Sequence, residues 1–223
     1  TFHIKLIGYY LIMINLEGIS PFAKGGNRKC FVHPDNPNRC LKVVHAGLLE
    51  KIIKNKPWYK KLRSKNSFDD NLREKKAYTQ KALKKDDPNL WKHLAKWYGM
   101  TETTIGMASE TELIRNGTEI AETLESYLFE NGITDEIKES IEDFHVWLRT
   151  HLVFTKNLIP HNLVLKKEDN RLIIKIIDGL GSQAFFPISN YSTFFANRYI
   201  ERRIELMWSR INWDLSGRQG NWK

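Results

Sequence analysis

Hydrophobic and turn-forming residues alternate along the first half of the chain in a pattern typical of β-strands. The apolar positions of residues 14–22 predict a strand that ends near Phe22. Residues 29–33 and 39–45 predict two more strands, and the segment 34–38 between them is rich in the Pro, Asp and Asn of tight turns. These two runs therefore predict a β-hairpin.

The second half of the chain changes to helical spacing. An apolar stripe with intervals of four, three and four residues predicts a helix that Thr134 or Asp135 caps. A second stripe of the same kind predicts a final helix over residues 190–212. Residues 163–165 and 172–177 predict a small hairpin between the two helices. The stripes consist of Ile137, Ile141, Phe144 and Leu148, and of Ile200, Ile204, Met207 and Ile211.

The segment between the strands and these helices is rich in lysine. Residues 48–65 predict an exposed helix and loop, and Ser67 or Asp69 can cap a helix that runs to about Leu83 with Glu74 inside it. The run Glu112-Leu113-Ile114 predicts the end of a strand. Strands that precede helices, with one hairpin among the helices, indicate an α+β fold with two lobes.

Composition restricts the class of protein. The chain has 223 residues, of which 41% are hydrophobic, so it can bury a sizeable core. Its longest apolar run, residues 6–14, is far shorter than the roughly 20 residues of a membrane-spanning helix. We therefore expect no membrane span. Two cysteines are too few for a disulfide framework.

Charge is distributed unevenly around a net value of +9. Residues 42–92 hold 15 Lys and Arg against 6 Asp and Glu, whereas residues 106–145 hold 2 against 11. A basic face can attract phosphates or nucleic acid, although charge runs are more often solvated helix faces. The basic stretch has neither zinc-finger spacing nor an aromatic RNA-binding signature, so nucleic acid is the least favoured partner.

Four short features follow one another in an order that suits a nucleoside triphosphate. Glycines between strands let backbone N–H groups approach phosphate oxygens, and a strand lysine held by a helix glutamate supplies positive charge. Asn and Asp oxygens can hold Mg²⁺. In chain order the features are Gly25-Gly26, Lys42, Glu74, and the pair Asn162 and Asp178.

The stretch from residue 19 to about residue 208 resembles the bacterial YrbL family, the PhoP regulatory network proteins. The residues that carry the resemblance are Gly25 to Pro34, Arg39 to Lys42, Leu72-Arg73-Glu74, Glu112-Leu113-Ile114, Thr123 to Leu128, Pro160-His161-Asn162 and Ile177-Asp178. The family is similar to protein kinases in fold. The resemblance implies a compact two-lobed, protein-kinase-like fold with a small β-rich N-lobe and a reduced helical C-lobe.

This resemblance implies three parts: an N-terminal extension over residues 1–13, an N-lobe over 14–116 and a helical C-lobe over 117–223. The N-lobe holds the glycine loop, the lysine strand and the glutamate helix. The C-lobe holds a hairpin that resembles the kinase catalytic loop.

The kinase resemblance also implies a role for each candidate residue in binding Mg-ATP. Lys42 pairs with the phosphates, Glu74 positions Lys42, and Asn162 and Asp178 hold the metal. Gly25 and Gly26 cover the phosphates, Cys30 and Cys40 sandwich the adenine, and the backbone of Glu112, Leu113 and Ile114 binds its edge. Both cysteines are then small packing residues, which we expect as free thiols in a reducing cytoplasm.

Departures from the kinase pattern bear on catalysis. Asn157 stands where kinases carry the catalytic aspartate, and an amide cannot accept a proton as a carboxylate can. The metal motif continues with Gly179, and only about 45 residues follow Asp178, too few for a full activation segment and a large helical lobe. His161, His151 and Lys156 are alternative bases, although His151 extends an apolar stripe and reads as a core histidine.

Three functional hypotheses follow. The first is an atypical ATP-dependent phosphotransferase acting on an unidentified acceptor, and the second is a pseudokinase-type module that binds a protein partner without transfer. The third is a basic nucleic-acid-binding protein. No Cys or His cluster has zinc spacing, and we expect neither zinc nor haem. The seven tryptophans are expected mainly in core packing, with Trp213 and Trp222 exposed.

Overall fold

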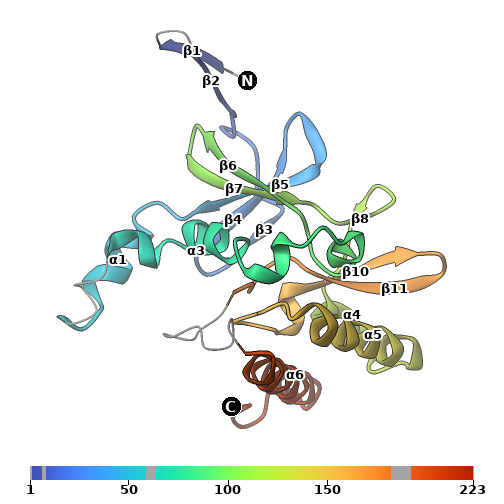
Figure 1. The fold of residues 1–223 in the computed structure, drawn as a ribbon. Coiled ribbons are helices and arrows are strands. Elements are labelled where there is room, and N and C mark those ends of the chain that lie inside the picture. Colours follow the sequence, from blue (N-terminus) through green and yellow to red (C-terminus); the bar gives the residue numbers. More distant parts are fainter. Residues whose placement is uncertain (1, 7–8, 59–63, 182–191, 223) are drawn as a thin grey trace. The chain divides into compact units, whose positions relative to one another are not determined.

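The computed structural model describes residues 2–6, 9–58, 64–181 and 192–222 (Figure 1). The chain divides into two compact units. The first unit consists of residues 1–76 and 96–113, and the second of residues 77–95 and 114–223. Among the described residues, no helix has the length and hydropathy needed to cross a membrane.

The first unit is built on a five-stranded antiparallel sheet in the order β3-β4-β5-β7-β6. Its strands are β3 (Ala23–Lys24), β4 (Arg28–His33), β5 (Asn36–Val44), β6 (Trp97–Thr103) and β7 (Gly106–Glu112). The predicted hairpin between residues 29 and 45 is confirmed by the pairing of β4 with β5. A separate hairpin joins β1 (Phe2–Leu6) to β2 (Tyr9–Met13).

Alternation along the strands separates the two faces of this sheet. One face carries a small buried core made by Phe31, Leu41, Val43 and Ala108 with Ile14 and Leu16. The other face carries Lys42, which lies opposite Cys30 on β4 and Ser109 on β7. The sheet therefore sends apolar residues to its core and a lysine to the opposite side.

The strand predicted for residues 14–22 is wrong. Only Ile14 makes a bridge, to Thr103, and the chain then turns. The Asn15 side chain accepts a hydrogen bond from the backbone N–H of Glu17 (2.9 Å), and Gly18 has a φ of +75°, in the left-handed region that glycine favours. These local bonds interrupt the strand although Leu16 is buried in the core.

Helix α1 (Leu48–Lys54), η1 (Lys65–Phe68) and α3 (Asp70–Ala77) follow the sheet strand β5. Asp69 caps α3 as predicted, because its carboxylate accepts a hydrogen bond from the backbone N–H of Asn71 (2.8 Å). The predicted end near Leu83 is wrong, since α3 ends at Ala77. The Gln80 side chain donates to the Ala77 carbonyl (3.1 Å), which satisfies a group that a longer helix would have used.

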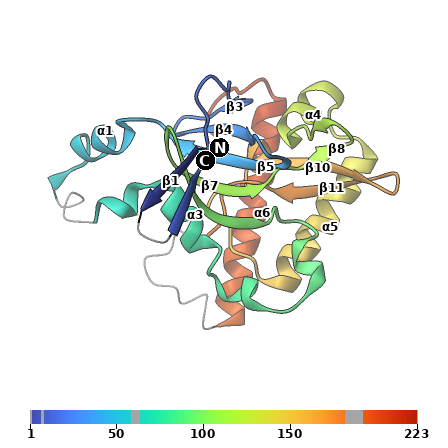
Figure 2. The same cartoon turned by 90° about the horizontal axis from the view of Figure 1, so that it is seen from above.

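The second unit contains helices and short strands (Figure 2). Its long helices are α4 (Leu124–Asn131), α5 (Asp135–His151) and α6 (Thr193–Leu215), and β10 (Leu163–Glu168) pairs with β11 (Arg171–Ile176). Short elements complete it: η2 (Lys81–Lys84), η3 (Pro88–Trp91), η4 (Pro160–Asn162), β8 (Arg115–Asn116) and β9 (Glu119–Ile120). The fold is a mixed α+β fold.

The predicted helices and hairpin of this unit are confirmed. Thr134 caps α5 by accepting a hydrogen bond from the Ile137 N–H (3.2 Å), and the predicted stripes of α5 and α6 are buried. The β10–β11 turn passes through Asp169 and Asn170, both with positive φ, as a tight hairpin turn requires. One large core holds these elements together.

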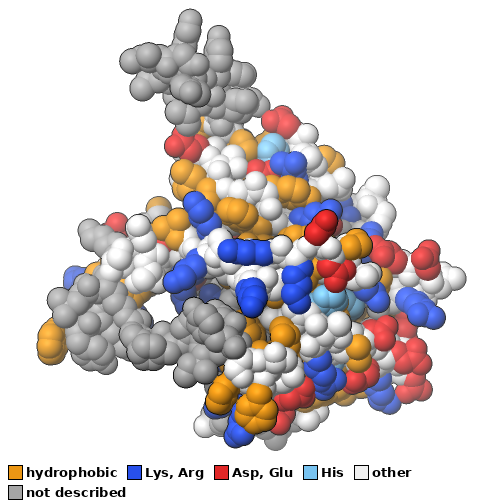
Figure 3. All heavy atoms as spheres, viewed as in Figure 1, with side chains coloured by type: hydrophobic (Ala, Val, Ile, Leu, Met, Phe, Trp, Pro, Cys, Tyr) orange, Lys and Arg blue, Asp and Glu red, His pale blue; other side chains and the backbone are white. Residues whose placement is uncertain are grey.

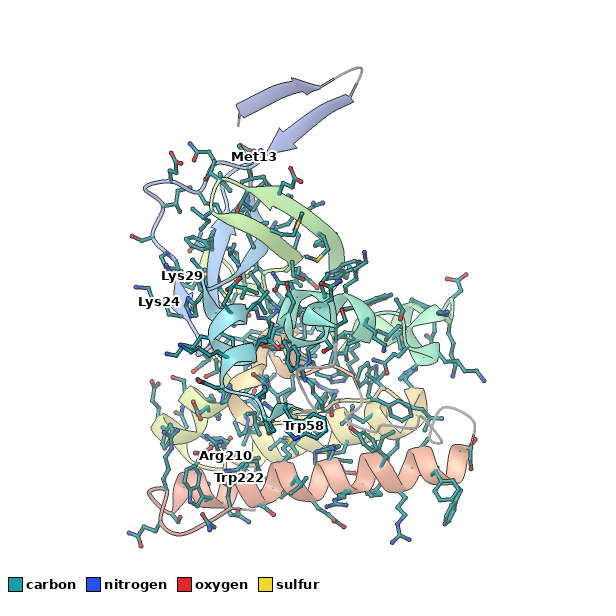
Figure 4. The ribbon with its side chains drawn as sticks, turned by 90° about the vertical axis from the view of Figure 1, so that its left-hand side faces the viewer. Met13, Lys24, Lys29, Trp58, Arg210 and Trp222 are labelled. Carbon is teal, nitrogen blue, oxygen red and sulfur yellow. The ribbon has the colours of Figure 1, made fainter. Side chains whose placement is uncertain are left out.

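The tryptophans depart from the expectation in two respects. Trp147 is buried in the core, whereas the Trp58 side chain is 77% exposed. Trp213 and Trp222 are half-buried, because the Arg210 guanidinium lies over both rings, at 4.9 and 5.4 Å from their centroids. Figure 4 shows Arg210 and Trp222 next to each other at the end of α6.

Candidate functional site

Lys42 and Glu74 form a buried ion pair in the first unit. The Lys42 Nζ atom lies 2.7 Å from Oε1 of Glu74, and the two side chains are 7% and 5% exposed. β5 positions the lysine on the face opposite the small core, and α3 presents the glutamate. The structure therefore brings together two residues that are 32 positions apart in the sequence.

Two further residues join this pair, and the sequence analysis did not predict them. Arg28 donates from Nη1 to Oε2 of Glu74 (2.7 Å) and to Oδ1 of Asn71 (3.3 Å). Asn71 donates from Nδ2 to the carbonyl of Lys42 (2.9 Å). Asn71 precedes Glu74 by three residues, so the two share a helix face, and that spacing is the signal that could have indicated it. We call Arg28, Lys42, Asn71 and Glu74 the Glu74 cluster.

The glycine loop is short, because Ala23–Lys24 belong to β3 and Arg28 begins β4. A Cβ atom added at Gly26 would meet nothing within 4 Å, and one at Gly25 only the Arg28 carbonyl at 3.7 Å. The glycines therefore leave the loop backbone open. Lys24 and Lys29 face each other across the strands that flank this loop (Figure 4).

Bonds at both ends hold the loop in place. The His45 Nε2 atom lies 2.9 Å from the Gly25 carbonyl, and the His45 N–H donates to the Asn27 carbonyl (3.0 Å). The Asn27 side chain donates to Asp70 in the first turn of α3 (2.7 Å). The loop is therefore attached both to the end of β5 and to the helix that carries Glu74.

Cys30 and Cys40 lie on neighbouring strands, on the same sheet face as Lys42. Cys40 is buried and Cys30 is half-buried, and both are free thiols in the structure. A hydrogen bond with Cys30 raises the pKa of the Cys40 thiol well above its ordinary value, and burial raises it further. The Cys40 thiol is therefore a small, neutral packing group in this sheet face.

The segment predicted to bind the adenine edge has several of its backbone groups already bonded. The Glu112 N–H donates to the Lys96 carbonyl (2.8 Å), and the Leu113 N–H donates to the Asn38 carbonyl (2.9 Å). The Ile114 carbonyl accepts from the Ala121 N–H (2.9 Å). These bonds do not use the Leu113 carbonyl or the Ile114 N–H.

In the second unit, backbone bonds bring Asn157, Asn162 and Asp178 into one pair of loops. We call residues 155–162 and 177–181 the metal-side loops. The Gly179 carbonyl accepts from the N–H groups of Lys156 (2.8 Å) and Asn157 (3.2 Å). The Asn162 carbonyl accepts from the Ile177 N–H (3.0 Å). Three residues predicted as site residues therefore lie side by side in this unit.

Gly179 is essential to that arrangement. Its φ is +81°, and a Cβ atom there would clash with the Asn157 carbonyl and lie 3.0 Å from Nδ2 of Asn162. Asn162 is buried and donates from Nδ2 to the Asn157 carbonyl (2.9 Å), a bond that leaves its side-chain oxygen unused. Asp178 is half-buried and accepts from the Gly179 N–H (2.6 Å).

Asn157 is exposed, and the loop bonds described above are made by its backbone groups. Of the alternative bases, His151 is buried as predicted, with Nδ1 3.4 Å from Asp87. The His161 side chain is 45% exposed, and its Nδ1 is 3.9 Å from the Glu125 carboxylate, too far for a hydrogen bond.

On the face shown in Figure 3, Lys and Arg side chains lie among Asp and Glu side chains. Groups of three or more His, Cys, Asp or Glu side chains able to hold a metal ion are absent from the residues that the structure describes. The arrangement offers one neutral and one acidic oxygen ligand, from Asn162 and Asp178, as a metal site.

Solved protein kinase domains share this fold. A double mutant of the PknI kinase domain of Mycobacterium tuberculosis aligns with a TM-score of 0.51 and 13% identity, over 93% of this chain and 74% of that one. The unmutated PknI kinase domain aligns with a TM-score of 0.50 and 12% identity, over 93% and 75%. At this identity the likeness concerns the fold, which is protein-kinase-like.

The sequence has curated relatives as well. YrbL of Escherichia coli (strain K12) and YrbL of Shigella flexneri are each 22% identical over 205 residues, which cover 89% of this chain and 86% of theirs. The family model described as PhoP regulatory network protein YrbL matches residues 14–212. The chain therefore belongs to the YrbL family of PhoP regulatory network proteins.

Proposed function

We propose that this protein binds Mg-ATP. The observation that carries the proposal is the buried Lys42–Glu74 pair, at 2.7 Å, in a kinase-like fold. Lys42 is the cation for the phosphates, and Glu74 orients it. Gly25 and Gly26 let the loop backbone approach the same phosphates.

Physical chemistry supports a functional reading of this pair. Moving two charges out of water costs several kcal/mol per ion, and apolar residues of similar size are often more stabilising than a buried ion pair. A pair whose side chains are only 7% and 5% exposed is therefore weak evidence for a stability role. A polyanionic ligand is a reason for the protein to keep such a lysine.

Asn162 and Asp178 would hold the magnesium ion that accompanies the nucleotide. Mg²⁺ prefers oxygen ligands and usually binds one or two carboxylates together with phosphate oxygens. Asp178 offers a carboxylate. The Nδ2 atom of Asn162 already donates a hydrogen bond to the Asn157 carbonyl, so the side-chain oxygen of Asn162 would be the atom that binds the metal. When bound, the ion would neutralise charge on the phosphates.

Adenine would be bound by the sheet face of Cys30 and Cys40 and by the segment 112–114. The Leu113 carbonyl and the Ile114 N–H belong to one trans peptide group and point in opposite directions, so one of the two would bond the adenine edge. The two thiols are small, so they leave room for a flat ring. Their free state also supports our assignment of the protein to the cytoplasm.

Phosphoryl transfer to an unidentified acceptor is a second candidate function. Such transfer relies on positioning and electrostatic stabilisation, which the Glu74 cluster and the metal-side loops could supply without a strong base. The exposed amide of Asn157 favours the opposite reading, a pseudokinase-type module that binds nucleotide and a protein partner without transfer. Nucleotide binding is common to both readings.

Isothermal titration of Mg-ATP into the wild type and into Lys42→Met tests the proposal. Glu74 keeps Arg28 as a partner in this variant, so the fold should survive while the phosphate cation is lost. We expect at least tenfold weaker binding for Lys42→Met and unchanged binding for Lys54→Met, which removes an exposed lysine of α1. Equal binding by all three proteins would contradict the proposal.

A further inference from the structure

We propose that Arg28 and Asn71 are positioning residues that hold Glu74 and helix α3 against Lys42 before any nucleotide is bound. This inference rests on the proposed function, because it concerns the same phosphate-binding groups. It goes beyond that function by assigning roles to two side chains that do not match the lysine, glutamate, asparagine and aspartate of the kinase pattern.

The Glu74 carboxylate has a separate cation for each oxygen. Lys42 lies 2.7 Å from Oε1, and Arg28 lies 2.7 Å from Oε2. The two bonds fix the rotation of the carboxylate about its last torsion, which is otherwise broad and poorly restrained. Arg28 is thus placed to keep Oε1 turned toward Lys42 rather than toward solvent.

Asn71 joins three elements through one amide group. Its Nδ2 donates to the Lys42 carbonyl on β5 (2.9 Å) and to the Met107 carbonyl on β7 (3.1 Å), and its Oδ1 accepts from Arg28 on β4. The side chain is 1% exposed, so each of these bonds is protected from water. An amide can donate twice and accept at once, a combination that neither Asp nor Leu offers.

These bonds also connect α3 to the glycine loop. Asn27 bonds Asp70 in the first turn of α3, and the next residue, Arg28, bonds Asn71 and Glu74. The loop that would cover the phosphates and the helix that carries Glu74 are therefore joined by direct side-chain bonds. The phosphate-binding side of the first unit is assembled in advance, which lowers the ordering cost of binding.

A role in sheet stability alone would give a different result from positioning, and Arg39 supplies the matched control. The Arg39 Nη1 atom on β5 lies 2.5 Å from Oε1 of Glu110 on β7. Because Arg39 and Lys42 are three residues apart on the same strand, their side chains lie on opposite faces of the sheet. Arg39→Met should therefore reduce stability without disturbing α3. Arg28→Gln should disturb α3 and the binding of nucleotide as well.

Native-state amide hydrogen exchange of α3 and Mg-ATP titration, run on the full chain, provide the test. We expect exchange at residues 72–76 to rise at least tenfold in Arg28→Gln and in Asn71→Ala, and to stay unchanged in Arg39→Met at matched global stability. Mg-ATP affinity should fall about tenfold in the first two variants, and Arg28→Lys should restore most of it by keeping a cation for Glu74.

The two readouts separate this inference from the proposed function. Unchanged α3 exchange in both Arg28→Gln and Asn71→Ala would overturn the positioning role, whatever the wild type binds. A rise in exchange with no change in Mg-ATP affinity would overturn it too. If the wild type binds no Mg-ATP, the proposed function fails, and α3 exchange still decides whether the two residues hold Glu74. Asn71→Ala carries the test if Arg28→Gln does not fold.

Discussion

The Glu74 cluster and the metal-side loops hold their functional groups by different means. In the first unit, buried side chains on β4, β5 and α3 bond one another, and the charged groups are 5–8% exposed. In the second unit, backbone groups of residues 155–162 and 177–181 bond one another, and the side chain at position 157 is left exposed.

The difference shows where each half can tolerate change. A side-chain network fixes the identity of its residues, because a buried charge without its partner is costly. A backbone network fixes only the path of the chain and the glycine that the path needs. The exposed side chain at position 157 can therefore change at little cost to the fold, whereas loss of Glu74 would be severe.

Removal of Glu74 should have the largest effect. Glu74→Ala leaves Lys42 and Arg28 without the carboxylate that both contact, and breaking a buried ion pair in this way costs roughly 3–5 kcal/mol. Urea unfolding measures the loss. Glu119→Ala, at an exposed position, should stay within about 0.5 kcal/mol of the wild type. A similar loss of unfolding free energy in Glu74→Ala and Glu119→Ala would contradict the claim that the Glu74 cluster is less tolerant of change than an exposed position.

Acid should destabilise the second unit. Burial lowers the pKa of His93 and of His145 from 6.5 to about 4. Between those values the unfolded chain binds protons that the folded chain does not, so stability is full above pH 6.5 and falls as the pH drops to 4.

For each histidine this loss amounts to about 3 kcal/mol at pH 4. The free energy of unfolding, measured from pH 7 to pH 4, gives the slope of stability against pH. His145→Phe should reduce this slope by the contribution of one histidine. A slope that His145→Phe leaves unchanged would argue against a buried neutral histidine at this position.

Gly179 should tolerate no side chain. The Cβ atom of Gly179→Ala would clash with the Asn157 carbonyl, and the backbone φ of +81° is unfavourable for alanine. We therefore expect the free energy of unfolding to fall by about 2 kcal/mol or more and the binding of Mg-ATP to be lost. Gly117→Ala is the matched control, since Gly117 has φ of +63° with nothing within 4 Å. It should lose only the roughly 1 kcal/mol that the backbone conformation costs. Equal losses in thermal unfolding would show that the clash is relieved.

Asn157→Asp should have the smallest effect on stability and the clearest effect on chemistry. The side chain is exposed, so the change should stay within about 0.5 kcal/mol. A positioned general base contributes about 10²–10⁴-fold, so ADP release from Mg-ATP should rise at least tenfold. Asn131→Asp, also exposed, should leave the rate unchanged. No increase would favour the reading as a binding module.

Local sequence patterns predicted the elements whose signals are strong. The stripes of α5 and α6, the Thr134 cap and the turns of two hairpins correspond to real structure, because periodicity and turn chemistry act within one element. The end of α3 and the strand over residues 14–22 were wrong. There, single polar side chains, Gln80 and Asn15, capture backbone groups that regular structure would have used.

The candidate site could be predicted only in part, for a related reason. Lys42 and Glu74 carried a recognisable order along the chain, and the structure pairs them. Arg28 and Asn71 contact them through bonds that span 29 to 46 positions, and no local pattern predicts such partners. Their importance follows from burial and from hydrogen-bonding capacity, which a single sequence does not contain.

The central claim, that the protein binds Mg-ATP, is tested most directly by thermal unfolding of the wild type with ATP in the presence and absence of Mg²⁺. Ligand at 100 times its dissociation constant stabilises a protein by about 2.7 kcal/mol, which corresponds to a rise in Tm of about 5–10 °C at this size. We predict a rise of that order with Mg²⁺ and a clearly smaller one when EDTA removes the metal. A Tm that ATP leaves unchanged under both conditions would contradict the account.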